Sequence, residues 1–194
     1  IEISEFNPIE TIDTNVNGTE NVIKMLIKQK PSKFINISTD KAADASTLYG
    51  NTKQLGERIT SWAGVHIKGT KSGTVRFGNV RETRGNVFEI WNEENRRNKP
   101  LSITDPTMKR YFIHTNEVID FILNALLIIN KGEIFVPKMK KFSVKELANE
   151  ISKKQKIIGL RQGEKIQEIL LNDEEKERAI EKKDMWVIDP YKKK

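Results

Sequence analysis

The stretch Lys33-Phe34-Ile35-Asn36-Ile37-Ser38-Thr39-Asp40-Lys41 decides how this chain can fold. Its first six residues are rich in β-branched side chains and predict a short strand that ends at Ser38. Apolar residues recur at helical spacing before it, from Ile9 to Leu26, and again after it, from Thr47 to His66. A second strand is expected from Gly73 to Phe77. Helix, strand, helix and strand at this pace are typical of a parallel sheet with helices on its faces.

The chain after Phe77 follows a different pattern, which predicts a smaller α/β lobe that shares an interface with the sheet. We expect helices over 87–97, from Thr115, after the capping box Ser143–Glu146 and over 173–182, and strands over 101–104, 133–136, 156–159 and 185–188. The predicted division is residues 1–84 for the sheet half, 85–190 mainly for the lobe with some segments returning to the sheet, and 191–194 for a basic tail.

Composition excludes several classes of function. The 194 residues include no cysteine and only two histidines, so neither a disulfide nor a metal site is expected. The net charge of +7 comes mostly from scattered lysines, and no basic stripe is interleaved with aromatic residues. Nucleic acid is therefore not an expected partner.

The most apolar stretch, Val118 to Ile129, contains Asp120 and Asn124 and is shorter than the roughly 20 residues that span a bilayer. We expect it to form a buried helix, and we expect no membrane segment in this chain. No signal peptide is recognisable, so a cytoplasmic location is predicted.

Tyr49 and Lys53 are four residues apart, which places them on one face of the predicted helix. A lysine ammonium near a phenol is expected to lower its pKa from about 10, so that Tyr49 could accept a proton from a substrate alcohol. The pair alone is weak evidence. It follows a strand that ends in Ser38-Thr39, however, and parallel sheets bind ligands at that edge.

The runs Ser38-Thr39-Asp40-Lys41-Ala42 and Tyr49-Gly50-Asn51-Thr52-Lys53 resemble the extended short-chain dehydrogenase/reductase superfamily. The closer resemblance is to its inverting UDP-N-acetylglucosamine 4,6-dehydratase branch, which serves flagellin-glycan and capsule biosynthesis. Further segments are similar to motifs of that branch: residues 15–19, 75–80, 84–87, 104–112, 132–136 and 159–165. Asp44-Ala45, Lys109 and Gln162 depart from its pattern.

This resemblance implies a Rossmann-like parallel sheet, of which the chain holds the C-terminal half. No glycine-rich phosphate loop occurs in the sequence, so we expect that loop before Ile1. The cofactor implied is NADP, with NAD less favoured, and the substrate implied is a UDP-sugar. A homo-oligomer is also expected.

The resemblance further implies a set of site residues. The catalytic residues are Thr39, Asp40, Lys41, Tyr49 and Lys53; the cofactor-binding residues are Asn15, Ser38, Tyr49, Lys53, Val80 and Arg84; and the substrate-binding residues are Asn79, Val87, Thr104, Arg161 and Glu164. In the implied reaction, Tyr49 removes the C4 hydroxyl proton as a hydride passes to NADP. Lys41 then removes the C5 proton, Asp40 protonates the departing C6 hydroxyl, and the hydride returns to C6. The product is a 4-keto-6-deoxy sugar with C5 inverted.

Two alternatives remain open at this level. A nucleotide-sugar 4-epimerase or reductase of the same superfamily would share Tyr49, Lys53 and Asn79, but it would not need Asp40 and Lys41. A noncatalytic partner module or an inactive fragment would need none of these residues, and the missing glycine-rich loop is compatible with that reading.

Overall fold

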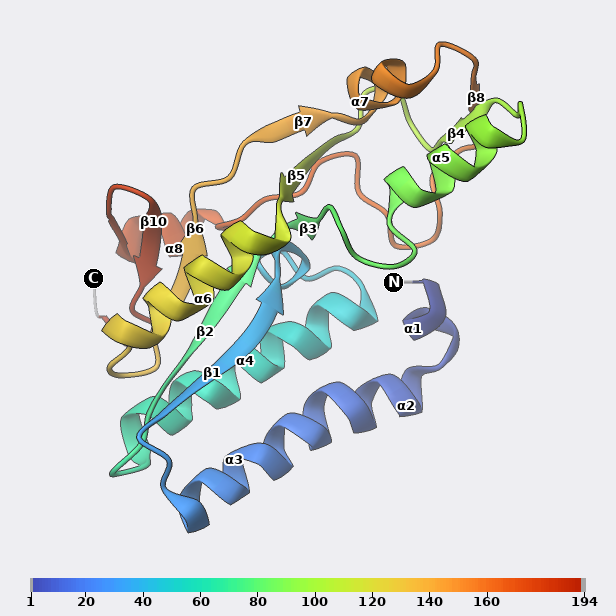
Figure 1. The fold of residues 1–194 in the computed structure, drawn as a ribbon. Coiled ribbons are helices and arrows are strands. Elements are labelled where there is room, and N and C mark those ends of the chain that lie inside the picture. Colours follow the sequence, from blue (N-terminus) through green and yellow to red (C-terminus); the bar gives the residue numbers. More distant parts are fainter. Residues whose placement is uncertain (1, 193–194) are drawn as a thin grey trace.

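The segment from Lys33 to Phe77 supplies two neighbouring strands at one edge of a five-stranded sheet in the computed structural model, which describes residues 2–192 (Figure 1). Strand β1 (Lys33–Thr39) pairs in parallel with β2 (Lys71–Phe77), and β6 (Ile134–Pro137) pairs in parallel with β2. Thr39 lies opposite Phe77 in this register, so the carboxyl ends of β1 and β2 meet at one edge of the sheet. The predicted parallel sheet with flanking helices is confirmed.

The far side of the sheet is antiparallel. Strand β10 (Met185–Ile188) pairs with β6 and with β9 (Ala179–Glu181), which gives the order β1-β2-β6-β10-β9. The helix predicted over 173–182 is wrong in its second half, because α8 (Asp173–Arg178) ends where β9 begins. Pairing of Ile180 with Val187 outweighs the helix propensity of this charged segment.

Two helical segments cover one face of the sheet. The first runs through α1 (Glu2–Phe6), α2 (Pro8–Ile12), the π-helical turn η1 (Asp13–Asn17) and α3 (Gly18–Gln29), and the second is α4 (Leu48–His66). Ile23 and Leu26 of α3 pack against Ala63 of α4 in a small core. The left-handed Lys30 ends α3 just before Pro31.

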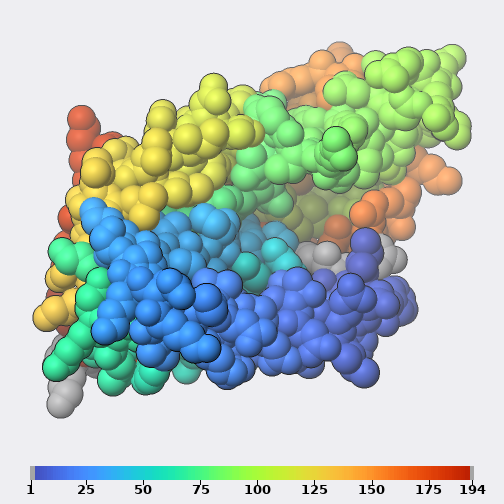
Figure 2. All heavy atoms as spheres, turned by 60° about the horizontal axis from the view of Figure 1, so that its bottom comes forward, coloured from blue at the N-terminus to red at the C-terminus, as the bar shows by residue number. Residues whose placement is uncertain are grey.

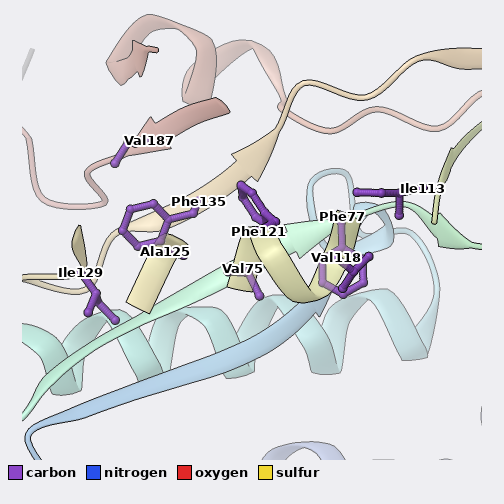
Figure 3. Packing of buried hydrophobic residues seen from close by; sticks show 9 residues of the cluster. All are labelled: Val75, Phe77, Ile113, Val118, Phe121, Ala125, Ile129, Phe135 and Val187. Atoms are coloured by element: carbon purple, nitrogen blue, oxygen red, sulfur yellow. The ribbon is translucent and has the colours of Figure 1, made fainter. Parts of the chain in front are cut away.

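Helix α6 (Thr115–Ile128) covers the opposite face and supplies the main core (Figure 3). That core contains Val75, Phe77, Ile113, Val118, Phe121, Ala125, Ile129, Phe135 and Val187. The prediction of a buried helix here is only half right, because Ile119, Leu123 and Leu127 are 49%, 54% and 74% exposed. Among residues 2–192, no helix has the length and apolar character needed to cross a membrane.

The lobe lies beyond the carboxyl end of β2 and has a core of its own, and Figure 2 shows its green and orange atoms at one end of the molecule. It contains the strands β3 (Asn79–Val80), β4 (Leu101–Ile103), β5 (Lys109–Ile113), β7 (Lys141–Ser143) and β8 (Gln155–Ile157), and the helices α5 (Val87–Arg96) and α7 (Val144–Ile151). Strands β3, β5 and β7 form one sheet, and β4 and β8 form another. Trp91 is fully buried at the centre of the lobe. The last two residues of the predicted basic tail lie outside the described residues.

Candidate active site

The chain leaves β1 through a short 3-10 turn, η2 (Asp40–Ala42), and then enters α4. Asp40 is buried in this turn, and its Oδ1 accepts hydrogen bonds from Lys41 Nζ at 2.9 Å and from Thr39 Oγ1 at 3.0 Å. Its second oxygen, Oδ2, is buried without a hydrogen-bond partner among the described residues. A buried carboxylate oxygen in this state is available to a ligand group that carries a proton.

Gly50 allows α4 to approach this turn closely. A Cβ atom at Gly50 would lie 2.6 Å from the backbone oxygen of Lys41, which is too close for any side chain. Thr47 caps the helix, since its Oγ1 accepts a hydrogen bond of 3.0 Å from the Gly50 amide. The same first turn of α4 carries Tyr49, so the phenol lies beside Asp40 and Lys41.

The electrostatics of Tyr49 differ from the prediction. Burial raises the pKa of its phenol, Lys41 acts to lower this pKa, and Asp40 acts to raise it further. Lys53 is not among the groups that shift this pKa, and its Nζ donates a 2.7 Å hydrogen bond to the Ile37 carbonyl of β1. The prediction that Lys53 lowers the pKa of Tyr49 is therefore wrong for this structure. Burial also lowers the pKa of Lys53 itself, against the opposing effect of Glu57.

Two of the predicted cofactor-binding residues, Asn15 and Lys53, line a groove of about 380 Å³ between β1 and the η1–α3 segment. Asn15 lies in the π-helical turn, and its Nδ2 donates to Thr52 Oγ1 at 3.0 Å. Ser38, at the end of β1, has a buried Oγ without a hydrogen-bond partner in the part of the chain that is described. An amide, a hydroxyl and an ammonium group of this kind can hydrogen-bond the hydroxyls of a ribose.

A second cavity, of about 570 Å³, lies in the lobe and brings together all five predicted substrate-binding residues. They are Asn79, Val87, Thr104, Arg161 and Glu164. Val80 and Arg84, which were predicted to bind cofactor, line this cavity and not the groove beside β1. Asn79 is fixed by a 3.1 Å hydrogen bond from its Nδ2 to the Tyr111 carbonyl.

Sequence reasoning missed two charged residues of this region. Arg110 lines the second cavity, and Glu168 is a buried carboxyl close enough to Asp40 and Lys41 for both to affect its ionisation. Arg110 belongs to the motif at 104–112, and Glu168 follows the motif at 159–165 by three residues. The signal available for Glu168 in the sequence was its position, three residues after the motif at 159–165.

The two regions touch through the loop that carries Arg161 and Glu164. Lys165 Nζ lies 2.5 Å from the carboxylate of Asp44, which belongs to the loop 40–46 after β1. The loop that follows Asp40 and Lys41 is therefore in direct contact with the segment that continues from the lining of the lobe cavity.

The family model for polysaccharide biosynthesis protein matches residues 1–190. The chain belongs to this family. Among curated relatives, it is 37% identical to the uncharacterized membrane protein MJ1061 of Methanocaldococcus jannaschii, over 98% of the chain and 62% of the relative. It is 34% identical to the inverting UDP-N-acetylglucosamine 4,6-dehydratase of Campylobacter jejuni, over 98% of the chain and 58% of that protein. The predicted resemblance to the dehydratase branch is thus confirmed.

An epimerase matches equally well. The UDP-glucose 4-epimerase of Rickettsia rickettsii is 36% identical, over 95% of the chain and 56% of its own length. The chain therefore spans about three fifths of the length of the curated relatives that it matches.

Solved structures agree with the fold. Pen from Bacillus thuringiensis superposes with a TM-score of 0.92 at 34% identity, over 97% of this chain and 62% of Pen. The UDP-glucose 4-epimerase of Thermus thermophilus superposes with a TM-score of 0.75 at 17% identity, over 88% of this chain and 65% of that one. The Rossmann-like α/β fold predicted from the sequence is confirmed.

Proposed function

We propose that the protein containing this chain removes water from a UDP-N-acetylhexosamine and yields a 4-keto-6-deoxy sugar, inverted at C5, for surface-glycan biosynthesis. The observation that carries the proposal is the pair of buried Asp40 and half-buried Lys41, 2.9 Å apart and close enough to Tyr49 to affect its pKa. Elimination of water needs a base and an acid near neighbouring carbons. An adjacent carboxyl and amine supply both groups.

In this proposal Tyr49 accepts the proton of the C4 hydroxyl. Lys41 removes the C5 proton, which the 4-keto group has made acidic, and Asp40 passes a proton to the departing C6 hydroxyl, so that water leaves and a C5–C6 double bond forms. Return of the hydride to C6 is matched by a proton added to C5 from the opposite face, which inverts C5. Thr39 keeps Asp40 in place through its 3.0 Å hydrogen bond, and the buried Oδ2 of Asp40 lacks a partner among residues 2–192 and can face the sugar.

A nicotinamide cofactor, when bound, would accept a hydride from C4 and return it to C6. Asn15, Ser38 and Lys53 are the residues of this chain that would hold its ribose and ring, beside Tyr49. Solved epimerases and dehydratases of this fold are described with NAD, whereas the resemblance to the inverting branch favours NADP.

The lobe cavity is proposed to hold the UDP part of the substrate. Arg161 and Arg110 are suited to the diphosphate, because a guanidinium can make paired charge-assisted hydrogen bonds to phosphate oxygens. Asn79, Thr104 and Glu164 would hydrogen-bond the sugar or the uracil.

A second candidate is a 4-epimerase, which the 36% identity to a UDP-glucose 4-epimerase favours. An epimerase would use Tyr49 and the cofactor but would leave the elements of water on the sugar. The mass of the product therefore separates the two reactions.

The first prediction concerns Lys41→Ala in the full-length product of the reading frame that encodes this chain. With UDP-N-acetylglucosamine, the wild type is expected to form a product lighter by one water. Lys41→Ala should lose at least about 100-fold in turnover, because general acid–base groups contribute about 10²–10⁴-fold, while still binding the UDP-sugar. Mass spectrometry and calorimetric titration measure the two quantities. Normal turnover of the variant, or an isomer of unchanged mass, would contradict the proposal.

A further inference from the structure

The segment after Glu164 hydrogen-bonds to two successive residues of the loop 40–46, Ala43 and Asp44. Lys165 Nζ donates hydrogen bonds both to the Asp44 carboxylate, at 2.5 Å, and to the Asp44 backbone oxygen. Asn172 Nδ2 donates a 2.9 Å hydrogen bond to the neighbouring carbonyl of Ala43. We call residues 165–172 the strap, because they cross from the lobe cavity to α8 over the turn that carries Asp40 and Lys41.

Rigid elements hold both ends of the strap. At its beginning, the Arg110 guanidinium donates to the Ile166 carbonyl at 3.0 Å. At its end, Asn172 caps α8, since its Oδ1 accepts a 2.8 Å hydrogen bond from the Glu175 amide. The strap is therefore held at both ends, so a displacement of one end would shift the other.

The middle of the strap also lies close to Asp40 and Lys41. Glu168 lies in its middle, is only 4% exposed, and interacts electrostatically with Lys41 and Asp40. The two anchors at Asp44 and Ala43 thus hold the 40–46 loop against a buried part of the strap.

The strap begins where the predicted diphosphate contact ends. Arg161 to Glu164 form a tight turn, in which the Glu164 amide donates to the Arg161 carbonyl at 3.1 Å and the Arg161 amide donates to the Glu164 carboxylate at 3.0 Å. A shift of Arg161 towards a ligand in the lobe cavity would move Lys165 with it.

We infer that Lys165 is a positioning residue, which through Asp44 aligns Asp40 and Lys41 with the sugar when the turn at Arg161–Glu164 engages the diphosphate. This inference rests on the proposed function. The Lys165–Asp44 pair is partly exposed, with side-chain exposures of 24% and 65%, so it contributes little to stability. Its loss should therefore appear in the chemical step and not in folding.

The test compares Lys165→Met, Asp44→Asn and the double variant in the full-length protein. Misplacement of reacting groups by about 1 Å can cost about 10²-fold in rate, so each single variant should lower kcat by roughly 10- to 100-fold, with KM for the UDP-sugar changed by less than about threefold. The double variant should be no worse than Lys165→Met alone, because Lys165→Met already removes the contacts to both the carboxylate and the backbone oxygen of Asp44. Lys165→Arg should restore part of the rate.

The control is Lys138→Met. It breaks the Lys138–Glu181 pair, which has a length of 2.6 Å and side-chain exposures of 31% and 68%, close to those of Lys165 and Asp44. Lys138 lies outside the strap and the lobe cavity. The kcat of the Lys138→Met variant should equal that of the wild type.

A second readout does not depend on the reaction. Backbone hydrogen exchange over 41–46 should be faster in Lys165→Met and in Asp44→Asn than in the wild type, and unchanged in Lys138→Met. If the wild type forms no dehydrated product, the proposed function fails while exchange still tests whether Lys165 holds the loop. Unchanged exchange, or a rise in KM alone with additive effects in the double variant, would overturn the positioning role.

Discussion

Environment sets the chemistry of individual residues in this site. Tyr49, which the sequence marks as a base, has a pKa that burial raises, and Lys41, not Lys53, is the positive charge that opposes this shift. Glu168, which no motif marks, is buried against the same Asp40–Lys41 pair. Asp40 and Lys41 therefore affect the ionisation of both Tyr49 and Glu168.

The substitution Glu168→Gln tests these electrostatic interactions through the pH dependence of the free energy of unfolding. Burial, with a further contribution from Asp40, raises the pKa of Glu168 above 4.5, although Lys41 opposes the shift. Between the unfolded and folded pKa values the folded state binds the extra proton, so stability falls as pH rises through that window. Glu168→Gln should therefore be more stable than the wild type at pH 8, and this advantage should shrink as pH falls to 4. Urea denaturation at several pH values measures it; an advantage that grows in acid would contradict the assignment.

At the level of elements, the start of helix α6 is stabilised both by a residue of the helix itself and by a residue from a loop distant in the sequence. The prediction that α6 begins at Thr115 is confirmed, and the Glu117 carboxylate in its first turn accepts a 2.8 Å hydrogen bond from the His114 amide. A second carboxylate, Glu82, comes from the loop after β3 and accepts hydrogen bonds from the Thr115 amide at 2.9 Å and from its hydroxyl at 3.0 Å.

Glu82→Gln is expected to weaken the start of α6 in a pH-dependent way. The hydrogen bond with His114, followed by that from the Thr115 amide, lowers the pKa of Glu82 to about 2. A lowered carboxyl pKa gives stability that is fully present above the unfolded value and is lost as pH falls towards the folded value. The variant should thus be less stable than the wild type above pH 5, and the difference should close between pH 4.5 and 2. Thermal unfolding followed by circular dichroism tests this, and a pH-independent difference would speak against it.

Across the whole molecule, Arg76 joins the sheet to two helices. It lies on β2, is 1% exposed, and binds Glu57 of α4 at 2.9 and 2.6 Å and Glu175 of α8 at 2.8 and 2.7 Å. Its remaining donor contact is to the Leu170 carbonyl of the strap, at 3.0 Å. Burial acts to lower the pKa of Arg76, but the two carboxylates outweigh it and keep the side chain charged.

Arg76→Met should cost about 3–5 kcal/mol in the free energy of unfolding, because it leaves Glu57 and Glu175 buried without a counter-charge. Arg96→Met, which breaks an exposed pair with Glu93, should change it by less than about 1 kcal/mol. Chemical denaturation gives both values. If Arg76→Met does not fold, Glu175→Gln removes one partner only and should still destabilise more than Arg96→Met. Equal effects at the buried and exposed sites would refute this role.

The sequence by itself determined the parallel core, the start of α4 after Thr47, the family, and five of the residues that line the lobe cavity. These features depend on local periodicity, on capping, and on side chains that lie within single short motifs. The end of the helix at Arg178, the exposed side of α6 and the direction of the Tyr49 pKa shift were predicted incorrectly. They depend on what a segment packs against, which local pattern does not contain.

Only the tertiary structure decided which distant residues meet. Lys165 and Asp44 are 121 residues apart, and Arg76 and Glu175 are 99 residues apart. No spacing rule relates such positions. Their contacts arise because the carboxyl ends of parallel strands converge at one edge of the sheet, and because a buried charge is stable only where the fold brings an opposite charge to it.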